Sequence, residues 1–194
     1  MLSPESIAEH FGYTSDWLRL RVVTATDLRE QFAVFEQSED KKTEHYRCAA
    51  FKNYLNRIEA VSDETLRDLL SLSDAGPDGC DLSVSRAFEL VNSDLLNDEQ
   101  LQSLRERQDL QQHASFQLLI NRALLERRLS SDGLTDSVFQ GICALNDPIT
   151  TQRLLDRDDL TRDHVAWVAE FGCGKRLRNV AMQRLNSRRF RDGG

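Results

Sequence analysis

The chain has 194 residues, of which 40% are hydrophobic and 29% charged, so it can bury the core of one compact domain or one short repeat array. It contains only 9 Gly and 3 Pro, and neither type occurs between Tyr13 and Ala75. Sandwiches and barrels need turn residues at short intervals, so this composition excludes an all-β fold and predicts an all-α one.

The N-terminus lacks the succession of basic, apolar and small residues that marks a signal peptide. No stretch approaches the ~20 apolar residues that span a bilayer. The four cysteines are widely spaced, which favours reduced thiols over the disulfides that a secreted chain would form. We therefore expect a cytoplasmic protein without membrane contact.

The first 22 residues are expected to form an N-terminal capping helix. Ser3, Pro4 and Glu5 make a typical helix start, because serine caps the first turn, proline fits its first position and glutamate suits the positive end of the helix dipole. The apolar surface of this helix would consist of Ile7, Phe11, Trp17 and Leu18. Large aromatic residues on apolar faces are expected in the core: Trp17, Phe51, Phe88 and Trp167.

A short phrase then recurs along the chain: an apolar residue, a capping residue, acidic residues and another apolar residue. Its five copies, of which the first is looser, start 38, 35, 38 and 26 residues apart. The copies are Val23–Leu28, Val61–Leu66, Leu96–Leu101, Leu134–Phe139 and Leu160–Val165. Ser, Thr and Asn accept hydrogen bonds from first-turn N–H groups, and acidic residues suit the helix dipole, so each copy predicts a helix start.

Each predicted start is followed by apolar residues at helical spacing, a polar break and a second helical pattern. The breaks fall at residues 38–42, 73–79, 111–112, 146–148 and 171–174. Helix pairs at quasi-regular spacing predict a single helical-repeat domain over residues 1–194. Residues 187–194 are expected to form a basic, frayed C-terminal tail.

Two of the second helices share a finer pattern: an apolar residue followed by Arg, then Ala three residues on and an apolar residue four beyond. It stands at Tyr46-Arg47, Ala50 and Tyr54, and again at Leu177-Arg178, Ala181 and Leu185. Over residues 23–190 the chain therefore resembles the HEAT and armadillo-like helical repeat superfamily. The resemblance implies a right-handed α-solenoid of about five irregular helix pairs. The spacings are shorter than the roughly 40–47 residues usual there, so a non-repetitive helical bundle stays an alternative.

No catalytic, cofactor or metal site is predicted. The four histidines lie in different helix pairs, and HxxxH, HExxH and CxxC spacings are all missing from the sequence. Asp163-His164 and Cys80-Asp81 are explained as parts of helix starts. Residues 172–176 lack the first glycine and the Ser or Thr of a phosphate-binding loop. Their glycines instead predict a helix start beside basic residues, where an anion could bind.

The net charge of −7 is distributed unevenly. Residues 172–194 hold seven Lys and Arg and one Asp, so this segment carries +6 and the preceding residues carry −13. The basic end can hold an anionic partner, or it can complement the acidic body and the negative end of a helix dipole. The candidate residues for an anionic partner are Lys175, Arg176, Arg178, Arg188 and Arg189. Arg184 would instead lie inward, where its long side chain can snorkel to solvent or pair with an acid such as Asp163 or Glu170.

Together these features predict a non-catalytic protein–protein interaction module or scaffold, with another protein or peptide bound on a curved helical surface. The alternative is binding of nucleic acid or another polyanion through the basic C-terminal helix. The acidic body argues against nucleic acid. A third alternative is an enzyme whose active-site residues come from several helices, but no sequence motif supports it.

Overall fold

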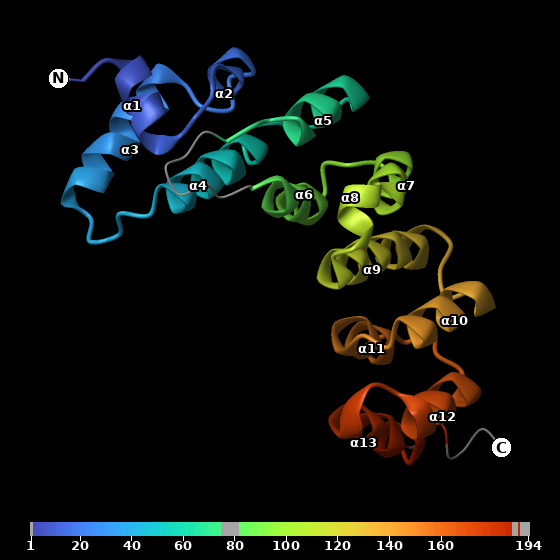
Figure 1. The fold of residues 1–194 in the computed structure, drawn as a ribbon. Helices are drawn as coiled ribbons and strands as arrows, with labels where there is room; N and C mark the ends of the chain where they lie inside the picture. Colours follow the sequence, from blue (N-terminus) through green and yellow to red (C-terminus); the bar gives the residue numbers. More distant parts are fainter. Residues whose placement is uncertain (1, 75–81, 188–189, 191–194) are drawn as a thin grey trace. The chain divides into compact units, whose positions relative to one another are not determined.

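The computed structural model describes residues 2–74, 82–187 and 190, and within them the chain forms 13 helices and no strand (Figure 1). The all-α class is therefore as predicted. Two compact units are present, Met1–Leu110 (unit 1) and Gln111–Gly194 (unit 2), and each is described by itself. A single helical-repeat domain over residues 1–194 stays a prediction.

The N-terminal segment contains two short helices, so the prediction of one capping helix over residues 1–22 was wrong. Helix α1 (Pro4–Phe11) begins after Ser3, whose side chain accepts a hydrogen bond from the Ser6 N–H. It ends at Gly12, which adopts a left-handed backbone with φ of 77°. A glycine in this conformation satisfies the last carbonyls of a helix and terminates it. Helix α2 (Ser15–Arg19) then starts separately.

The remaining helices of unit 1 follow in chain order. They are α3 (Ala25–Gln37), α4 (Thr43–Leu55), α5 (Asp63–Leu70), α6 (Ser83–Asn92) and α7 (Asp98–Glu106), while α8 (Gln108–Gln111) crosses the unit boundary. Helix α1 packs against α3 and α4, and α6 packs against both α4 and α5. Trp17 and Phe51 are buried with their ring centroids 6.3 Å apart, as expected for core residues.

Unit 2 contains the five remaining helices. They are α9 (Ala114–Ser131), α10 (Asp136–Leu145), α11 (Pro148–Leu155), α12 (Arg162–Phe171) and α13 (Gly174–Leu185). Helix α10 packs against α9 and α11, and α13 packs against α11 and α12. The turn between α12 and α13 needs glycine, because a Cβ at Gly172 would lie 2.4 Å from the Val168 carbonyl oxygen and Gly174 has a φ of 73°.

The five predicted helix starts are confirmed. In each copy of the recurring phrase the Ser, Thr or Asn side chain accepts a hydrogen bond from the N–H three residues on, at 2.8–3.3 Å. The capping residues are Thr24, Ser62, Asn97, Thr135 and Thr161, and they begin α3, α5, α7, α10 and α12. In α3, α7 and α12 the residue at the donor position also bonds back, which completes a capping box.

The core of unit 1 contains buried charge. Asp74 lies between two guanidinium groups, 2.6 Å from Arg86 and 3.4 Å from Arg47, and all three side chains are at most 3% exposed. Arg47 also donates to the Phe11 carbonyl at 2.5 Å, and Arg86 donates to the Leu72 carbonyl. The cluster therefore ties α4 and α6 to the ends of α1 and α5.

In unit 2 two arginines join helices through their guanidinium groups. Arg122 of α9 binds Asp147 through two hydrogen bonds of 2.7 and 3.0 Å, and Asp147 also caps α11. Arg184 of α13 donates to the carbonyls of Leu155, the last residue of α11, and of Arg157, and not to Asp163 or Glu170, the acids predicted as its partners. Exposed helix-end carbonyls attract a guanidinium as an acid would, and they satisfy this one.

Candidate interaction surfaces

The predicted anion-binding residues lie at the start of α13. Lys175 and Arg176 are exposed in its first turn, which begins at Gly174 as the glycines indicated. Arg178 is half-buried and donates to the Gly172 carbonyl at 3.0 Å. Arg188 and Arg189 lie outside the described residues, as does most of the predicted tail over 187–194. The structure therefore brings Lys175, Arg176 and Arg178 together.

The position of these cations distinguishes the two explanations given for them, which are binding of an anionic partner and compensation of charge within the protein. The N-terminal end of a helix carries the positive end of its dipole, so Lys175 and Arg176 gain nothing from α13. The N-cap residue, Cys173, supplies no side-chain hydrogen bond to the first turn. Arg178 instead lies against the C-terminal end of α12. Complementation of the C-terminal end of α12 thus explains Arg178 but leaves Lys175 and Arg176 available to an anion.

A second surface lies in unit 1, where the N-termini of α5 and α7 meet. The Gln100 amide donates to the Val61 carbonyl at 2.9 Å and to Asp63 at 2.8 Å, while its oxygen accepts from the Asn97 N–H. Gln100 is 4% exposed, so this junction is buried. One side chain therefore completes the capping box of α7 and fixes its N-terminus beside that of α5.

This alignment leaves a groove of about 370 Å³ between the two helices, which we call the α5–α7 groove. Leu66, Leu70 and Leu104 lie along it, of which Leu66 and Leu104 are buried in the fold and Leu70 is half-buried. Its polar lining consists of Asp63 and Glu99 in the first turns, Arg67 and Ser103 farther along, and Arg107 after α7. Apolar lining with a few polar side chains is typical of sites that bind peptides or small ligands.

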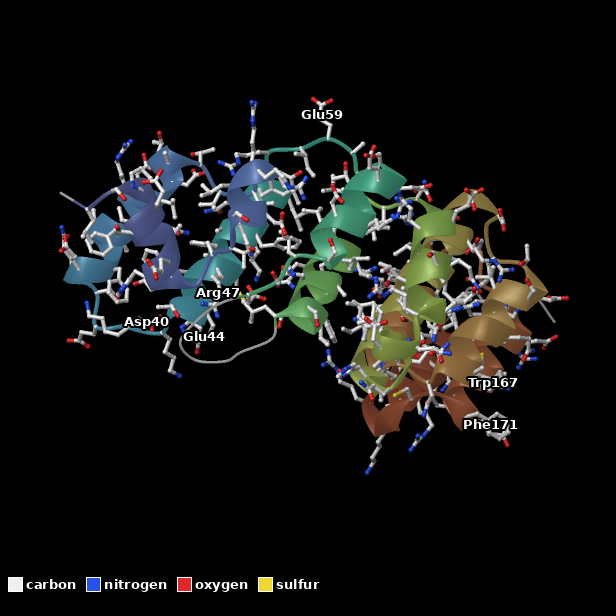
Figure 2. All side chains as sticks on the ribbon, turned by 45° about the horizontal axis from the view of Figure 1, so that its top comes forward. Asp40, Glu44, Arg47, Glu59, Trp167 and Phe171 are labelled. Carbon is white, nitrogen blue, oxygen red and sulfur yellow. The ribbon has the colours of Figure 1, made fainter. Side chains whose placement is uncertain are left out.

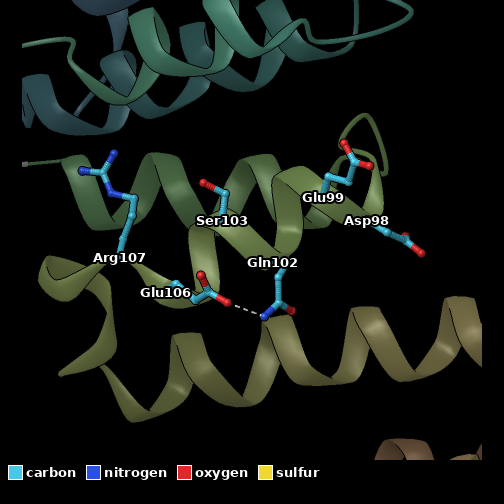
Figure 3. A pocket seen from close by; sticks show the side chains of 6 residues that line it. All are labelled: Asp98, Glu99, Gln102, Ser103, Glu106 and Arg107. Carbon is cyan, nitrogen blue, oxygen red and sulfur yellow. Dashed lines mark hydrogen bonds between the residues drawn. The ribbon is translucent and has the colours of Figure 1, made fainter.

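The outer side of α7 also carries a shallow, widely open hollow. Figure 3 shows Asp98 and Glu99 at one end of this helix and Arg107 at the other, with a hydrogen bond of 2.6 Å between Gln102 and Glu106. Glu99, Ser103 and Arg107 line both the hollow and the α5–α7 groove. Helix α7 is thus accessible on two adjoining sides.

The charged residues of the groove differ in what they already bind. Arg107 holds Asp109 through two hydrogen bonds of 2.6 and 3.0 Å, which lower the pKa of the Asp109 carboxyl. Asp63 accepts from Gln100. Within the described part of the chain, the exposed side chains of Arg67, Glu99 and Ser103 form no hydrogen bond or ion pair. These three are the polar groups that a ligand would find unoccupied.

A third exposed feature is aromatic and belongs to unit 2. Trp167 and Phe171 of α12 project side by side (Figure 2), with ring centroids 5.5 Å apart. Phe171 is 58% exposed, and Trp167, which was expected in the core, is half-buried against Phe139 at 5.8 Å. This pair adds an exposed apolar patch but no polar group that indicates a ligand.

The described residues contain no group of three His, Cys, Asp or Glu side chains that could hold a metal ion. Asp163-His164 belongs to a helix start as predicted, since the His164 ring accepts from the Thr161 N–H. Cys80-Asp81 lies outside the described residues. In the same part of the chain, no helix is long and apolar enough to cross a bilayer.

The α5–α7 groove was not predicted from the sequence. In the sequence its residues belong only to two copies of the helix-start phrase. The position of Gln100 three residues after Asn97 indicates a capping box and does not indicate a contact between helices. The chain matches no family model, and comparison with curated proteins and with solved structures found no significant similarity.

Proposed function

We propose that this protein is a helical-repeat interaction module that binds a segment of another protein in the α5–α7 groove. The groove carries the proposal, because it combines an apolar lining with exposed polar groups that have no partner within the described residues. Such a surface gains apolar contact from the half-buried Leu70 and selectivity from the charges. No chemical step is assigned to it.

Contacts between successive helix pairs support a stacked-repeat arrangement. Among first helices, α5 and α7 meet at their N-termini through Gln100, and α10 and α12 meet through the rings of Phe139 and His164 at 4.4 Å. Among second helices, α4 contacts α6 and α11 contacts α13. In an α-solenoid such as a HEAT-like array, the first helix of each pair packs against the first helix of the next pair, and the second helices pack in the same way. Such an array presents an extended binding surface.

A second candidate function is binding of a polyanion at α13. It is favoured by Lys175 and Arg176, whose exposed charges lie at the positive end of the helix dipole and are not compensated there. The two functions differ in the unit that would carry them. A cytoplasmic location is proposed for either, in keeping with the free thiols of Cys48, Cys143 and Cys173.

The test is to fill the groove. We would select binders to the full chain from a random displayed-peptide library and measure their affinity by fluorescence polarisation for two variants. Ser103→Trp places an indole in the groove, whereas Ser115→Trp places one on an exposed position of α9 and serves as the matched control. We expect Ser103→Trp to weaken binding at least about tenfold and Ser115→Trp to leave it unchanged. Equal binding to both variants would refute the proposal, and loss with Lys175→Glu/Arg176→Glu instead would establish the polyanion surface.

A further inference from the structure

We propose that unit 2 carries a separate docking surface, formed by Trp167 and Phe171 of α12 with Lys175 and Arg176 of α13, which fits an acidic polypeptide segment that also presents an apolar side chain. We call these four residues the α12–α13 corner. The α5–α7 groove belongs to unit 1, so this inference goes beyond the groove. It gives the second candidate function a partner of stated chemistry and an apolar contact.

The aromatic pair supplies the apolar part of the corner. Phe171, the last residue of α12, is 58% exposed, and its ring centroid lies 5.5 Å from that of Trp167 (Figure 2). Trp167 is half-buried and packs on Phe139 at 5.8 Å, which holds one ring of the pair in place. Aromatic side chains are enriched among the residues that dominate binding in protein interfaces. The exposed ring of Phe171 is therefore the contact on which an apolar side chain would rest.

The turn between the two helices brings the cations close to this ring. Phe171 and Lys175 are four residues apart, so their Cα atoms lie within ~14 Å of each other. The Arg178 guanidinium donates to the carbonyl of Gly172, the residue directly after Phe171, at 3.0 Å. Lys175 stands one turn before Arg178 on the surface of α13 and so lies next to this contact. A segment that rests on Phe171 can thus also meet the cations of the first turn of α13.

The charges of the corner favour an acidic polypeptide over a nucleic acid. Lys175 and Arg176 are exposed, and neither forms a hydrogen bond or ion pair within the described residues. The helix that carries the aromatic pair also exposes two acids, Asp163 and Glu170. A nucleic acid has a phosphate at every nucleotide and would be repelled by these carboxylates. A polypeptide can place one acid at the two cations and an uncharged or basic residue beside Glu170.

Selection on a chain with a blocked groove tests this inference. Peptides are selected from a random displayed library on Ser103→Trp, and their affinity is measured by fluorescence polarisation in that background. We expect peptides that combine an acidic residue with an apolar one. Phe171→Ala should weaken their binding about tenfold, whereas Met182→Ala, which removes another exposed apolar side chain of unit 2, should change it by less than about twofold.

A charge exchange tests the cations separately. Lys175→Glu/Arg176→Glu should weaken binding of the same peptides about tenfold, and a peptide whose acidic residue is changed to Lys should recover most of that loss. Arg29→Glu, an exposed charge reversal on α3, should change binding by less than about twofold and is the matched control. Far-UV circular dichroism of each variant shows that the helices are retained.

Several results would overturn the inference. If no peptide is selected, if the selected peptides lack acids, or if Phe171→Ala binds them unchanged, the corner is not a docking surface for such segments. Binding of a single-stranded oligothymidylate that Lys175→Glu/Arg176→Glu abolishes would assign the corner to nucleic acid instead. Binding of phosphatidylserine vesicles that Phe171→Ala abolishes would assign it to a membrane surface. Failure of the proposed function is a different result, in which peptides selected on the wild-type chain are insensitive to Ser103→Trp.

Discussion

The two compact units bury charge in different ways. In unit 1, Asp74 faces two guanidinium groups, Arg47 and Arg86, all of them removed from water. In unit 2, Asp147 faces the single guanidinium of Arg122, which is 20% exposed, and is buried beside Thr150 and Thr151. When a buried acid between two cations is removed, buried positive charge loses its compensation. When an acid paired with a partly exposed cation is removed, water can hydrate that cation. Unit 1 should therefore depend more strongly on a single side chain.

The largest effect is expected from Asp74→Asn. This change keeps the shape of the side chain but removes the carboxylate that faces the buried guanidinium groups of Arg47 and Arg86, so unit 1 should lose about 3–5 kcal/mol of its free energy of unfolding. Urea denaturation in a Trp167→Phe background gives the value for unit 1, because Trp17, which is buried there, is then the remaining tryptophan. A loss under about 1 kcal/mol would show that water reaches the cluster.

Asp147→Asn should have a smaller effect in unit 2, about 1–3 kcal/mol at neutral pH. Burial opposes ionisation of Asp147, but hydrogen bonds from Arg122 and Thr150 outweigh it and hold the pKa of this carboxyl below its ordinary 3.8. A carboxyl with a depressed folded-state pKa stabilises the fold above its unfolded-state pKa, and this contribution is lost as the pH falls through the folded-state pKa.

The difference between wild type and Asp147→Asn should therefore shrink as the pH falls below about 3.9. Hydrogen exchange of α9 and α11 measures it, and Asp163→Asn, an exposed acid of α12, is the control. A difference that stays constant from neutral to acidic pH would mean that ionisation of Asp147 does not contribute.

Removing a helix cap should lower the free energy of unfolding of the two units by the same amount. Ser62→Ala in unit 1 and Thr135→Ala in unit 2 each delete a bond to the first turn, of 3.1 and 3.3 Å, and each should destabilise by ~1 kcal/mol in chemical denaturation. Ser103→Ala, at an exposed helical position without a side-chain hydrogen bond, should cost nothing. An unchanged midpoint for both cap variants would show that these bonds do not contribute to stability.

The smallest effect is expected at α13. Lys175→Glu/Arg176→Glu exchanges two cations for anions at the positive end of the helix dipole, so thermal unfolding should show a stabilisation of about 0.3–1 kcal/mol. Arg67→Glu, made in the last turn of α5 in unit 1, should act in the opposite direction by a similar amount. If the α13 variant is destabilised, its cations have favourable contacts within the fold.

The helix starts could be predicted because they are local. Thr24, Ser62, Asn97, Thr135 and Thr161 each act on an N–H three residues away, so a short window of sequence contains the whole interaction. The end of α1 was missed, although Gly12 stands in the sequence, because the apolar residues on both sides of it fit one helix.

Contacts between distant residues could not be predicted. Arg47, Asp74 and Arg86 are ordinary surface residues in sequence, and only packing of α4 on α6 makes them a buried cluster. The α5–α7 groove depends in the same way on Gln100 reaching Val61. The basic residues of α13 were recognisable because they are neighbours in the chain, but Arg178 turned out to bind a carbonyl.

Hydrogen–deuterium exchange of the full chain, with and without a selected peptide, compares the two units in one measurement. Binding in the α5–α7 groove should slow exchange in residues 63–70 and 98–107 of unit 1 and leave residues 174–185 of unit 2 unchanged. Slower exchange in residues 174–185, with none in α5 and α7, would contradict the proposed function and place the contact on the basic helix.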